Sequence, residues 1–218
     1  MDIIDKKKYT GERGRVFILS GPSGTGKDTV FNHMMTQQPG IDHVAKCVTA
    51  TTRNPNKDHG EKSQHTYLFL SRSEFLDRVI DGYFLEYAEY AHNLYGTPIS
   101  GVMDKVNAGM DVFLIIEVQG AAIVKRKLRD AIMIFLVPPS FSALEKRLRL
   151  RSRDTSEAIR KRLESAIIEM NAIPSYDYLL VNDSVEQTAM ELRSIIVAER
   201  SRIRVGHSFI LNNDNSDG

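Results

Sequence analysis

The residues with the clearest chemical potential form the run Gly21-Pro22-Ser23-Gly24-Thr25-Gly26-Lys27, which fits the pattern G-x-x-x-x-G-K. Glycines allow a tight turn in which successive backbone N–H groups point at one anion, and the start of a following helix adds the positive end of its dipole. The lysine of this pattern reaches the β- and γ-phosphates of a nucleotide. An apolar strand precedes the run and a helical pattern follows it, so the sequence predicts a phosphate-binding loop.

The position after Lys27 departs from the usual pattern. Asp28 stands where a Ser or Thr normally offers a hydroxyl to magnesium, and Thr29 follows it. The carboxylate could bind the metal directly, since magnesium prefers oxygen ligands. It could instead turn away and leave Thr29 or water in that place, or it could repel the phosphates. A large gain in activity of Asp28→Ser at every magnesium concentration would favour repulsion.

Further segments make the sequence resemble a guanylate kinase of the bacterial type. In chain order they are Thr49-Ala50-Thr51-Thr52-Arg53, Phe84-Leu85-Glu86-Tyr87, Tyr95-Gly96-Thr97, Glu117-Val118-Gln119-Gly120 and Tyr176-Asp177-Tyr178-Leu179-Leu180-Val181-Asn182-Asp183. With the phosphate loop, this resemblance extends to about Arg200. It is far more specific than the phosphate loop alone.

The resemblance implies an α/β fold of the P-loop NTPase type, with three α/β/α layers around a parallel sheet. It implies a guanylate-kinase-like domain over residues 14–205, between an N-terminal extension (1–13) and a polar C-terminal tail (206–218). Within that domain we expect a core of residues 14–48 and 99–205. An inserted GMP-binding subdomain covers about 49–98, and a short mobile lid covers about 149–160.

The implied reaction is transfer of the terminal phosphoryl group of ATP to GMP or dGMP, with Mg²⁺ as the cofactor. Chemistry supports a guanine acceptor, because guanine presents N1–H and an exocyclic NH₂ side by side, and one carboxylate such as Glu86 accepts from both. Adenine presents an acceptor at N1 and would face that carboxylate with a lone pair. The hydroxyls of Thr49 and Thr97 can complete the contact.

The resemblance also implies a set of residues around the GMP phosphate and ribose. Besides Glu86, Thr49 and Thr97, the GMP-binding residues are Arg53, Lys57, Tyr67, Tyr95, Gly96 and Glu117. The family usually has a second arginine where Asn56 stands, so we expect Lys57 to supply that charge without the bidentate fork of arginine. Glu117 takes the place of a family Asp, and Ile115 takes that of an earlier acidic residue.

Catalysis by such a kinase consists of aligning the two nucleotides, excluding water and neutralising charge. The expected catalytic residues are Lys27, Arg53, Arg151 and Arg162. A charge-stabilising arginine contributes about 10³–10⁵ in rate in phosphoryl transfer. The ATP-binding residues are expected to be Gly21, Ser23, Gly24, Thr25, Gly26, Lys27, Asp28, Thr29, Arg147 and Asn182, with Asp28 and Thr29 as candidate metal ligands. The family's hinge glycine is replaced in Arg151-Ser152-Arg153.

The elements that must position these residues alternate between strands and helices, which indicates a parallel sheet covered on both faces. The expected strands cover residues 16–20, 44–49, 67–70, 84–87, 112–118, 131–137 and 178–181. The expected helices cover 27–38, 73–80, 99–108, 141–150, 157–171 and 185–204. The strands at 112–118 and 131–137 are nearly apolar throughout, as buried parallel strands are.

Composition limits the partners and the compartment. The chain has 218 residues, and 29 Lys+Arg against 28 Asp+Glu give a net charge of +1. That balance gives no reason to expect a nucleic acid or a membrane surface as partner. Cys47 is alone, no apolar run reaches the length of a membrane span, and the first residues lack a signal-peptide core. We therefore expect a cytoplasmic protein, with a homodimer left open and no histidine in a zinc-like spacing.

Two other classes of protein have sequences similar to this one. One is a catalytically weak, guanylate-kinase-like module that binds phosphopeptides, but such modules typically lack the loop lysine and the lid arginines. The other is a phosphate-loop kinase for a different nucleoside monophosphate, against which Glu86, Thr49 and Thr97 argue. A coupled assay with ATP and each monophosphate separates all three.

Overall fold

A five-stranded parallel sheet lies at the centre of the structure, a computed structural model that describes residues 13–54, 67–90, 92–151 and 155–203. Its strand order is β2-β7-β1-β8-β9. The strands are β1 (Val16–Ser20), β2 (Val44–Lys46), β7 (Asp111–Ile115), β8 (Ile132–Val137) and β9 (Tyr178–Val181). The phosphate loop leaves the carboxyl end of the middle strand, where open parallel sheets commonly bind ligands.

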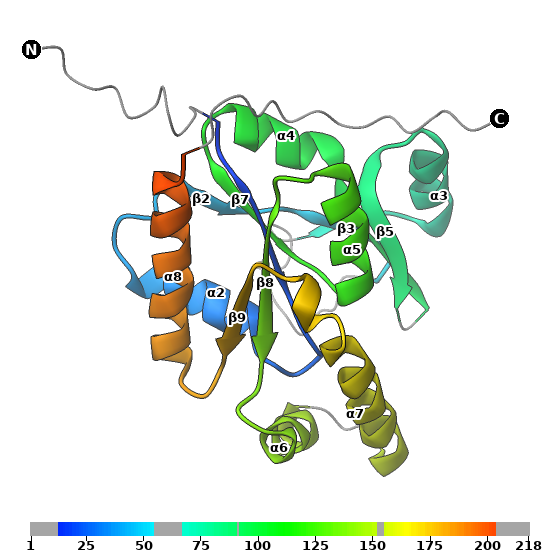
Figure 1. Ribbon diagram of the computed structural model, residues 1–218. Helices are drawn as coiled ribbons and strands as arrows, with labels where there is room; N and C mark the ends of the chain where they lie inside the picture. Colours follow the sequence, from blue (N-terminus) through cyan, green and yellow to red (C-terminus); the bar gives the residue numbers. More distant parts are fainter. Residues whose placement is uncertain (1–12, 55–66, 91, 152–154, 204–218) are drawn as a thin grey trace, which may run out of the picture.

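Helices cover both faces of this sheet, as Figure 1 shows. They are α2 (Lys27–Gln37) and α8 (Val185–Ser201) on one face, and α4 (Ile99–Asn107) and α5 (Val118–Lys127) on the other. Strand β1 serves both: Phe17 and Leu19 pack in the α2–α8 core, and Val16 and Ile18 pack in the α4–α5 core. Every residue of β1 is buried, which explains the uninterrupted apolar run over residues 16–19, before Ser20. The predicted three-layer α/β/α class is confirmed.

A second, four-stranded sheet lies beside the first, in the order β4-β3-β6-β5. Its elements are β3 (Thr49–Thr51), β4 (Tyr67–Phe69), helix α3 (Arg72–Ile80), β5 (Phe84–Tyr90) and β6 (Asn93–Pro98). It has a small core of its own, in which Phe75 of α3 stacks on Phe84 with 4.4 Å between ring centroids. Ser71 and Glu74 form a capping box that starts α3. These elements span residues 49–98, the range given above to the inserted subdomain, whose role in GMP binding remains a prediction.

The chain passes between the two sheets at two neighbouring places. The first crossing is Cys47-Val48, between β2 and β3, and the second is the step from Pro98 into α4. A Cβ built on Gly101 would lie 3.8 Å from Pro98 and 3.9 Å from the Cys47 sulfur, so both crossings lie next to Gly101.

Three sequence expectations about elements were wrong or incomplete. The strand expected over residues 44–49 is two strands in different sheets, because the chain leaves β7 at Cys47 to pair with β4 and β6. The strand expected over 112–118 ends at Ile115, and Glu117 is the N-cap of helix α5. Neither α5 nor β6 was predicted.

Helices α6 (Phe141–Arg151) and α7 (Ser156–Met170) lie beyond the carboxyl end of the central sheet (Figure 1). They pack on each other through Leu144, Leu148, Ile159 and Ala166. The range predicted as the lid begins in the last turn of α6 and ends in the first turns of α7, while residues 152–154 lie outside the described part. A short 3₁₀ helix, Ile173–Ser175, leads to β9. No helix within the described ranges is long and apolar enough to cross a membrane.

Candidate active site

The phosphate loop has a conformation that only glycine adopts without strain at its key positions. Gly21 has φ of 141°, and Gly26, the N-cap of α2, has φ of 94°. A Cβ on Gly21 would lie 2.2 Å from the carbonyl oxygen of Leu136, so the loop passes against the backbone of β8. The first N–H groups of α2 have no intrahelical acceptors, which makes this helix start suited to an anion.

Side chains hold the carbonyl groups of this loop. The Lys27 ammonium donates to the carbonyls of Gly21 and Pro22. The Thr25 hydroxyl also donates to the Pro22 carbonyl, at 2.9 Å. These bonds fix the loop before any nucleotide arrives, and such preorganisation reduces the entropy cost of binding.

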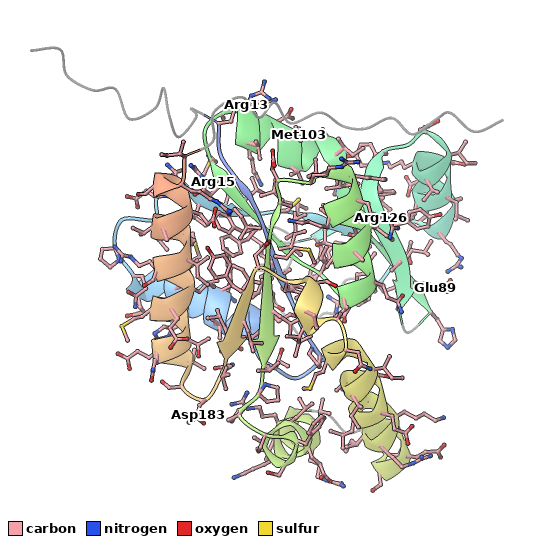
Figure 2. The ribbon with its side chains drawn as sticks, in the orientation of Figure 1. Arg13, Arg15, Glu89, Met103, Arg126 and Asp183 are labelled. Atoms are coloured by element: carbon pink, nitrogen blue, oxygen red, sulfur yellow. The ribbon has the colours of Figure 1, made fainter. Side chains whose placement is uncertain are left out.

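Two residues predicted to bind ATP, one just after β9 and one on α6, support the loop through hydrogen bonds. Asn182, only 2% exposed, donates its amide to the Thr25 carbonyl at 2.7 Å. Arg147 of α6 donates to the Asn182 carbonyl, also at 2.7 Å. Figure 2 labels Asp183, the residue after Asn182, at the end of the sheet where α6 lies. The structure thus brings Arg147 and Asn182 together with the loop, and their direct contact with ATP stays a prediction.

A cavity of about 250 Å³ lies between the phosphate loop and the second sheet. Most of the residues predicted to bind GMP line it, together with Lys27 of the loop. The lining residues are Lys27, Asp28, Thr49, Tyr67, Glu86, Ala88, Tyr95, Ile115, Ile116, Glu117 and Gly120. The cavity therefore joins the loop to a wall with several hydrogen-bonding side chains.

Glu86 is the buried acid of this cavity, 6% exposed. It lies on β5 opposite Thr97 of β6, whose hydroxyl donates to Oε1 of Glu86 at 2.6 Å. Burial raises the pKa of Glu86, and the hydrogen bond from Thr97 and the charge of Lys127 oppose that shift. A Cβ on Gly120 would lie 2.9 Å from Oε2 of Glu86, so the first turn of α5 leaves space for this carboxylate only because residue 120 is glycine.

Tyr67 lines the cavity, and Arg53, which is not among the lining residues, packs against its ring. The guanidinium carbon of Arg53 lies 5.2 Å from the ring centroid of Tyr67, a cation–π contact. Thr49 of β3 pairs with Tyr67 of the parallel strand β4, which fixes the position of Tyr67 in the second sheet. The Nε of Arg53 is buried and has no hydrogen-bond acceptor among the described residues. Burial raises the pKa of the Tyr67 phenol, and the charge of Asp28 adds to that rise.

Two glutamates from different elements lie near Lys27. Glu117 was predicted from the sequence and is exposed at the start of α5. Glu169 of α7 was missed, because nothing in the local sequence distinguishes it from other helix-surface acids. Burial raises the pKa of Glu169, the charge of Glu117 raises it further, and the charge of Lys27 lowers it. An acidic residue facing the phosphate-loop lysine can be found only once α7 is placed.

The hydrogen bonds and packing contacts described above do not test the predicted roles of several site residues. Lys57 and Asn56 lie outside the described residues, as does Arg153. Arg151 is the last residue of α6, and Arg162 lies on α7, partly buried. The helices that carry both lid arginines are therefore the two that lie beyond the carboxyl end of the central sheet.

Comparison with known proteins agrees with this geometry. The family model described as guanylate kinase matches residues 13–199. The chain belongs to the guanylate kinase family. It is 43% identical over 199 residues to a guanylate kinase from Streptococcus thermophilus, covering 90% of this chain and 93% of that protein. A guanylate kinase from Clostridium tetani is 38% identical over 204 residues, covering 93% of this chain and 95% of that one.

A solved structure supports the same conclusion. The crystal structure of guanylate kinase from Anaplasma phagocytophilum matches with a TM-score of 0.70 and 32% identity, covering 88% of each chain. The fold of this guanylate kinase family member is thus shared along nearly its whole described length.

Proposed function

We propose that the protein phosphorylates GMP, and dGMP, with ATP as the donor. The observation that carries this proposal is the buried Glu86, which accepts a hydrogen bond from Thr97 and lines a cavity that Lys27 of the phosphate loop also lines. A carboxylate costs free energy to bury unless hydrogen bonds compensate it. Here Thr97 accounts for one hydrogen bond only, and the N1–H and exocyclic NH₂ of guanine would provide two more.

The same wall disfavours other bases. Adenine would present its N1 lone pair to a carboxylate acceptor, and uracil or cytosine would be too small to reach it from the same phosphate position. Such unpaired buried groups discriminate strongly between substrates. We therefore expect selectivity for the guanine base and little selectivity at the ribose 2′ position, for which the described residues offer no clear partner beyond Glu117.

The phosphoryl group would be transferred in line from ATP on the loop to the phosphate of GMP. Lys27 supplies positive charge beside the transferring group, and Arg53, held over the ring of Tyr67, supplies it on the acceptor side. Arg151, the last residue of α6, and Arg162, in the middle of α7, would add charge and exclude water when these helices close over the nucleotides. The protein forms no covalent bond, and its contribution is alignment and charge neutralisation.

We also propose Mg²⁺ as the cofactor. Magnesium is usually held by one or two carboxylates together with substrate phosphates, rather than by an all-protein cage. The donors present fit that pattern: Asp28 and Glu117 line the cavity beside Lys27, Thr29 is exposed in the same helical turn as Asp28, and the described residues contain no group of three metal-ligating side chains. When bound, the ion would neutralise charge between the β- and γ-phosphates.

A coupled assay of ADP formation tests this function. Purified protein is given ATP, Mg²⁺ and one of GMP, dGMP, AMP, UMP or CMP, with Lys27→Met as a control that should lose about 10²–10³ in rate. We expect turnover with GMP and dGMP only. Turnover with another monophosphate would replace the substrate, and no turnover with any would reject the kinase reaction. Two predictions from the sequence remain untested: a cytoplasmic location and the lack of a nucleic-acid or membrane partner. The sequence leaves open whether the protein is a homodimer.

A further inference from the structure

Lys46 and Asp28 form an ion pair between the central sheet and the helix that follows the phosphate loop. The Lys46 Nζ lies 2.6 Å from Oδ1 of Asp28. The backbone of Lys46 is held in place, since it pairs with Phe113 of β7 and its carbonyl accepts a hydrogen bond from the Lys105 ammonium at 3.2 Å. The lysine therefore reaches Asp28 from a fixed position at the end of β2.

The carboxylate of Asp28 lies where phosphates are expected. Asp28 directly follows Lys27 in the first turn of α2, and both line the cavity that contains Tyr67 and Glu86. The charge of Asp28 is close enough to Tyr67 to raise the pKa of its phenol. A carboxylate without a partner at this point would repel the phosphates of both nucleotides, because like charges close to one another repel.

We infer that Lys46 is a positioning residue of the phosphoryl-transfer site: it neutralises Asp28 and holds its carboxylate against β2, so that phosphates can bind beside an acidic residue. The inference rests on the proposed function, because it requires phosphates in this cavity. It assigns a role to a lysine that lies outside every motif of the sequence. It also bears on the hypothesis that Asp28 repels the phosphates: under this inference, Asp28 repels them only when Lys46 is removed.

An ordinary surface ion pair would behave differently. The side chain of Asp28 is 55% exposed and that of Lys46 is 24% exposed, and pairs with such exposure contribute little to the stability of a fold. Loss of Lys46 should therefore leave the melting temperature nearly unchanged. If the pair serves the site, the loss appears in nucleotide affinity, where the effect of Asp28 is no longer offset.

The test is a double-mutant cycle read by calorimetry at low salt. The affinities for GMP and for an unreactive ATP analogue are measured without added Mg²⁺ for the wild type, Lys46→Met, Asp28→Ser and the double variant. We expect Lys46→Met to weaken binding of both ligands about tenfold, and we expect the double variant to return to within about twofold of the wild type. Asp28→Ser alone should bind at least as tightly as the wild type. Higher salt should reduce the effect of Lys46→Met.

Two controls separate the site from general loss of charge or folding. Arg72→Met removes the cation of an exposed pair with Glu89 on the second sheet and should change neither affinity. Lys46→Arg keeps the charge and should stay within about threefold of the wild type even if Lys46→Met is poorly folded. An affinity of Lys46→Met equal to that of Arg72→Met overturns the inference, and so does a double variant that binds no better than Lys46→Met.

The outcome is separable from the proposed function. Failure of the wild type to phosphorylate GMP would reject the kinase assignment. The cycle with the ATP analogue would still report whether Lys46 compensates Asp28.

Discussion

Thr97 donates its hydroxyl proton to Oε1 of Glu86 at 2.6 Å across the β5–β6 hairpin, while Oε2 of the same carboxylate lies over Gly120. The strand pair thus fixes one oxygen of Glu86, and the helix start limits the space around the other. An acid held from two sides in this way has one orientation, and it faces the cavity beside the phosphate loop. Replacement of Glu86 is therefore the most direct test of which nucleoside monophosphate the site selects.

Glu86→Gln should lower kcat/KM for GMP by about 10²–10³, because a neutral amide replaces the acceptor of two donor groups of guanine and presents one donor of its own. The KM for ATP should stay within about twofold. Steady-state kinetics with each substrate varied in turn measures both values.

Glu89→Gln is the matched control on the same strand. Glu89, labelled in Figure 2 near the outer end of the hairpin, is exposed and pairs with Arg72 at 3.3 Å. Its replacement should change kcat/KM by less than about twofold. Equal effects of the two substitutions would remove Glu86 from guanine recognition.

Glu86 should also make stability and GMP binding depend on pH. Burial raises its folded-state pKa above the ordinary 4.5, so the folded protein binds the proton more tightly than the unfolded chain. This contribution to the free energy of unfolding is complete below pH 4.5 and is lost as the pH rises through the folded pKa. At neutral pH, Glu86→Gln should therefore melt at a higher temperature than the wild type.

The affinity for GMP should depend on pH in the opposite direction to the stability. The KM of the wild type for GMP should rise as the pH falls through the raised pKa, because the protonated acid accepts fewer hydrogen bonds. The KM of Glu86→Gln should stay flat over the same range. A wild-type profile that is flat down to pH 4.5 would contradict the raised pKa.

Gly120→Ala should raise the KM for GMP by about tenfold or more, since its Cβ would lie 2.9 Å from Oε2 of Glu86 and displace that carboxylate. The KM for ATP should not change. Gly101→Ala is the matched control on helix α4, where the new Cβ meets its nearest atoms at 3.8 Å and 3.9 Å. That variant should keep its kinetics and gain about 0.5–1 kcal/mol of stability from helix propensity.

Cys47 should be almost inert in the native protein. Burial raises the pKa of its thiol to about 11, with the charge of Lys105 opposing and that of Glu86 adding to the rise. The thiolate, which is the reactive form, is then about one part in a thousand at pH 8. A chromogenic thiol reagent should react at least about a hundredfold faster in denaturant than in buffer. Rapid labelling of the native protein would show that Cys47 is accessible.

The parts of the fold that sequence could predict are those that local pattern determines. The phosphate loop was found because its glycines and Lys27 lie within seven positions, and the buried strands were found from their apolar runs. Helix α5 was missed for a related reason: the apolar run from Val112 continues one residue past the end of β7, to Ile116, and Val118 follows a single Glu117, so composition does not separate the end of the strand from the start of the helix.

The missed site residues depend on contacts between distant segments. Lys46 and Asp28 are eighteen positions apart and meet only because β2 and α2 flank the same end of the sheet. Glu169 reaches the neighbourhood of Lys27 from α7, and no spacing in the sequence indicates it. Glu86 and Thr97 were predicted through resemblance to a family, since a single Glu in a strand is ordinarily an exposed charge.

The two chain crossings beside Gly101 also limit how the molecule can move. The backbone joins the second sheet to the first at two adjacent points, so a rotation about the line between them changes few backbone dihedrals. The packing of Leu85 in the α4–α5 core and of Glu86 against Gly120 limits the size of that rotation. Thr49 and Thr97 lie close to this axis, whereas the outer end of the β5–β6 hairpin lies far from it. A small angular change therefore leaves Thr49 and Thr97 almost in place and changes the width of the cavity most at its far rim, so that the opening of the cavity and the placement of these two hydroxyls are mechanically separate.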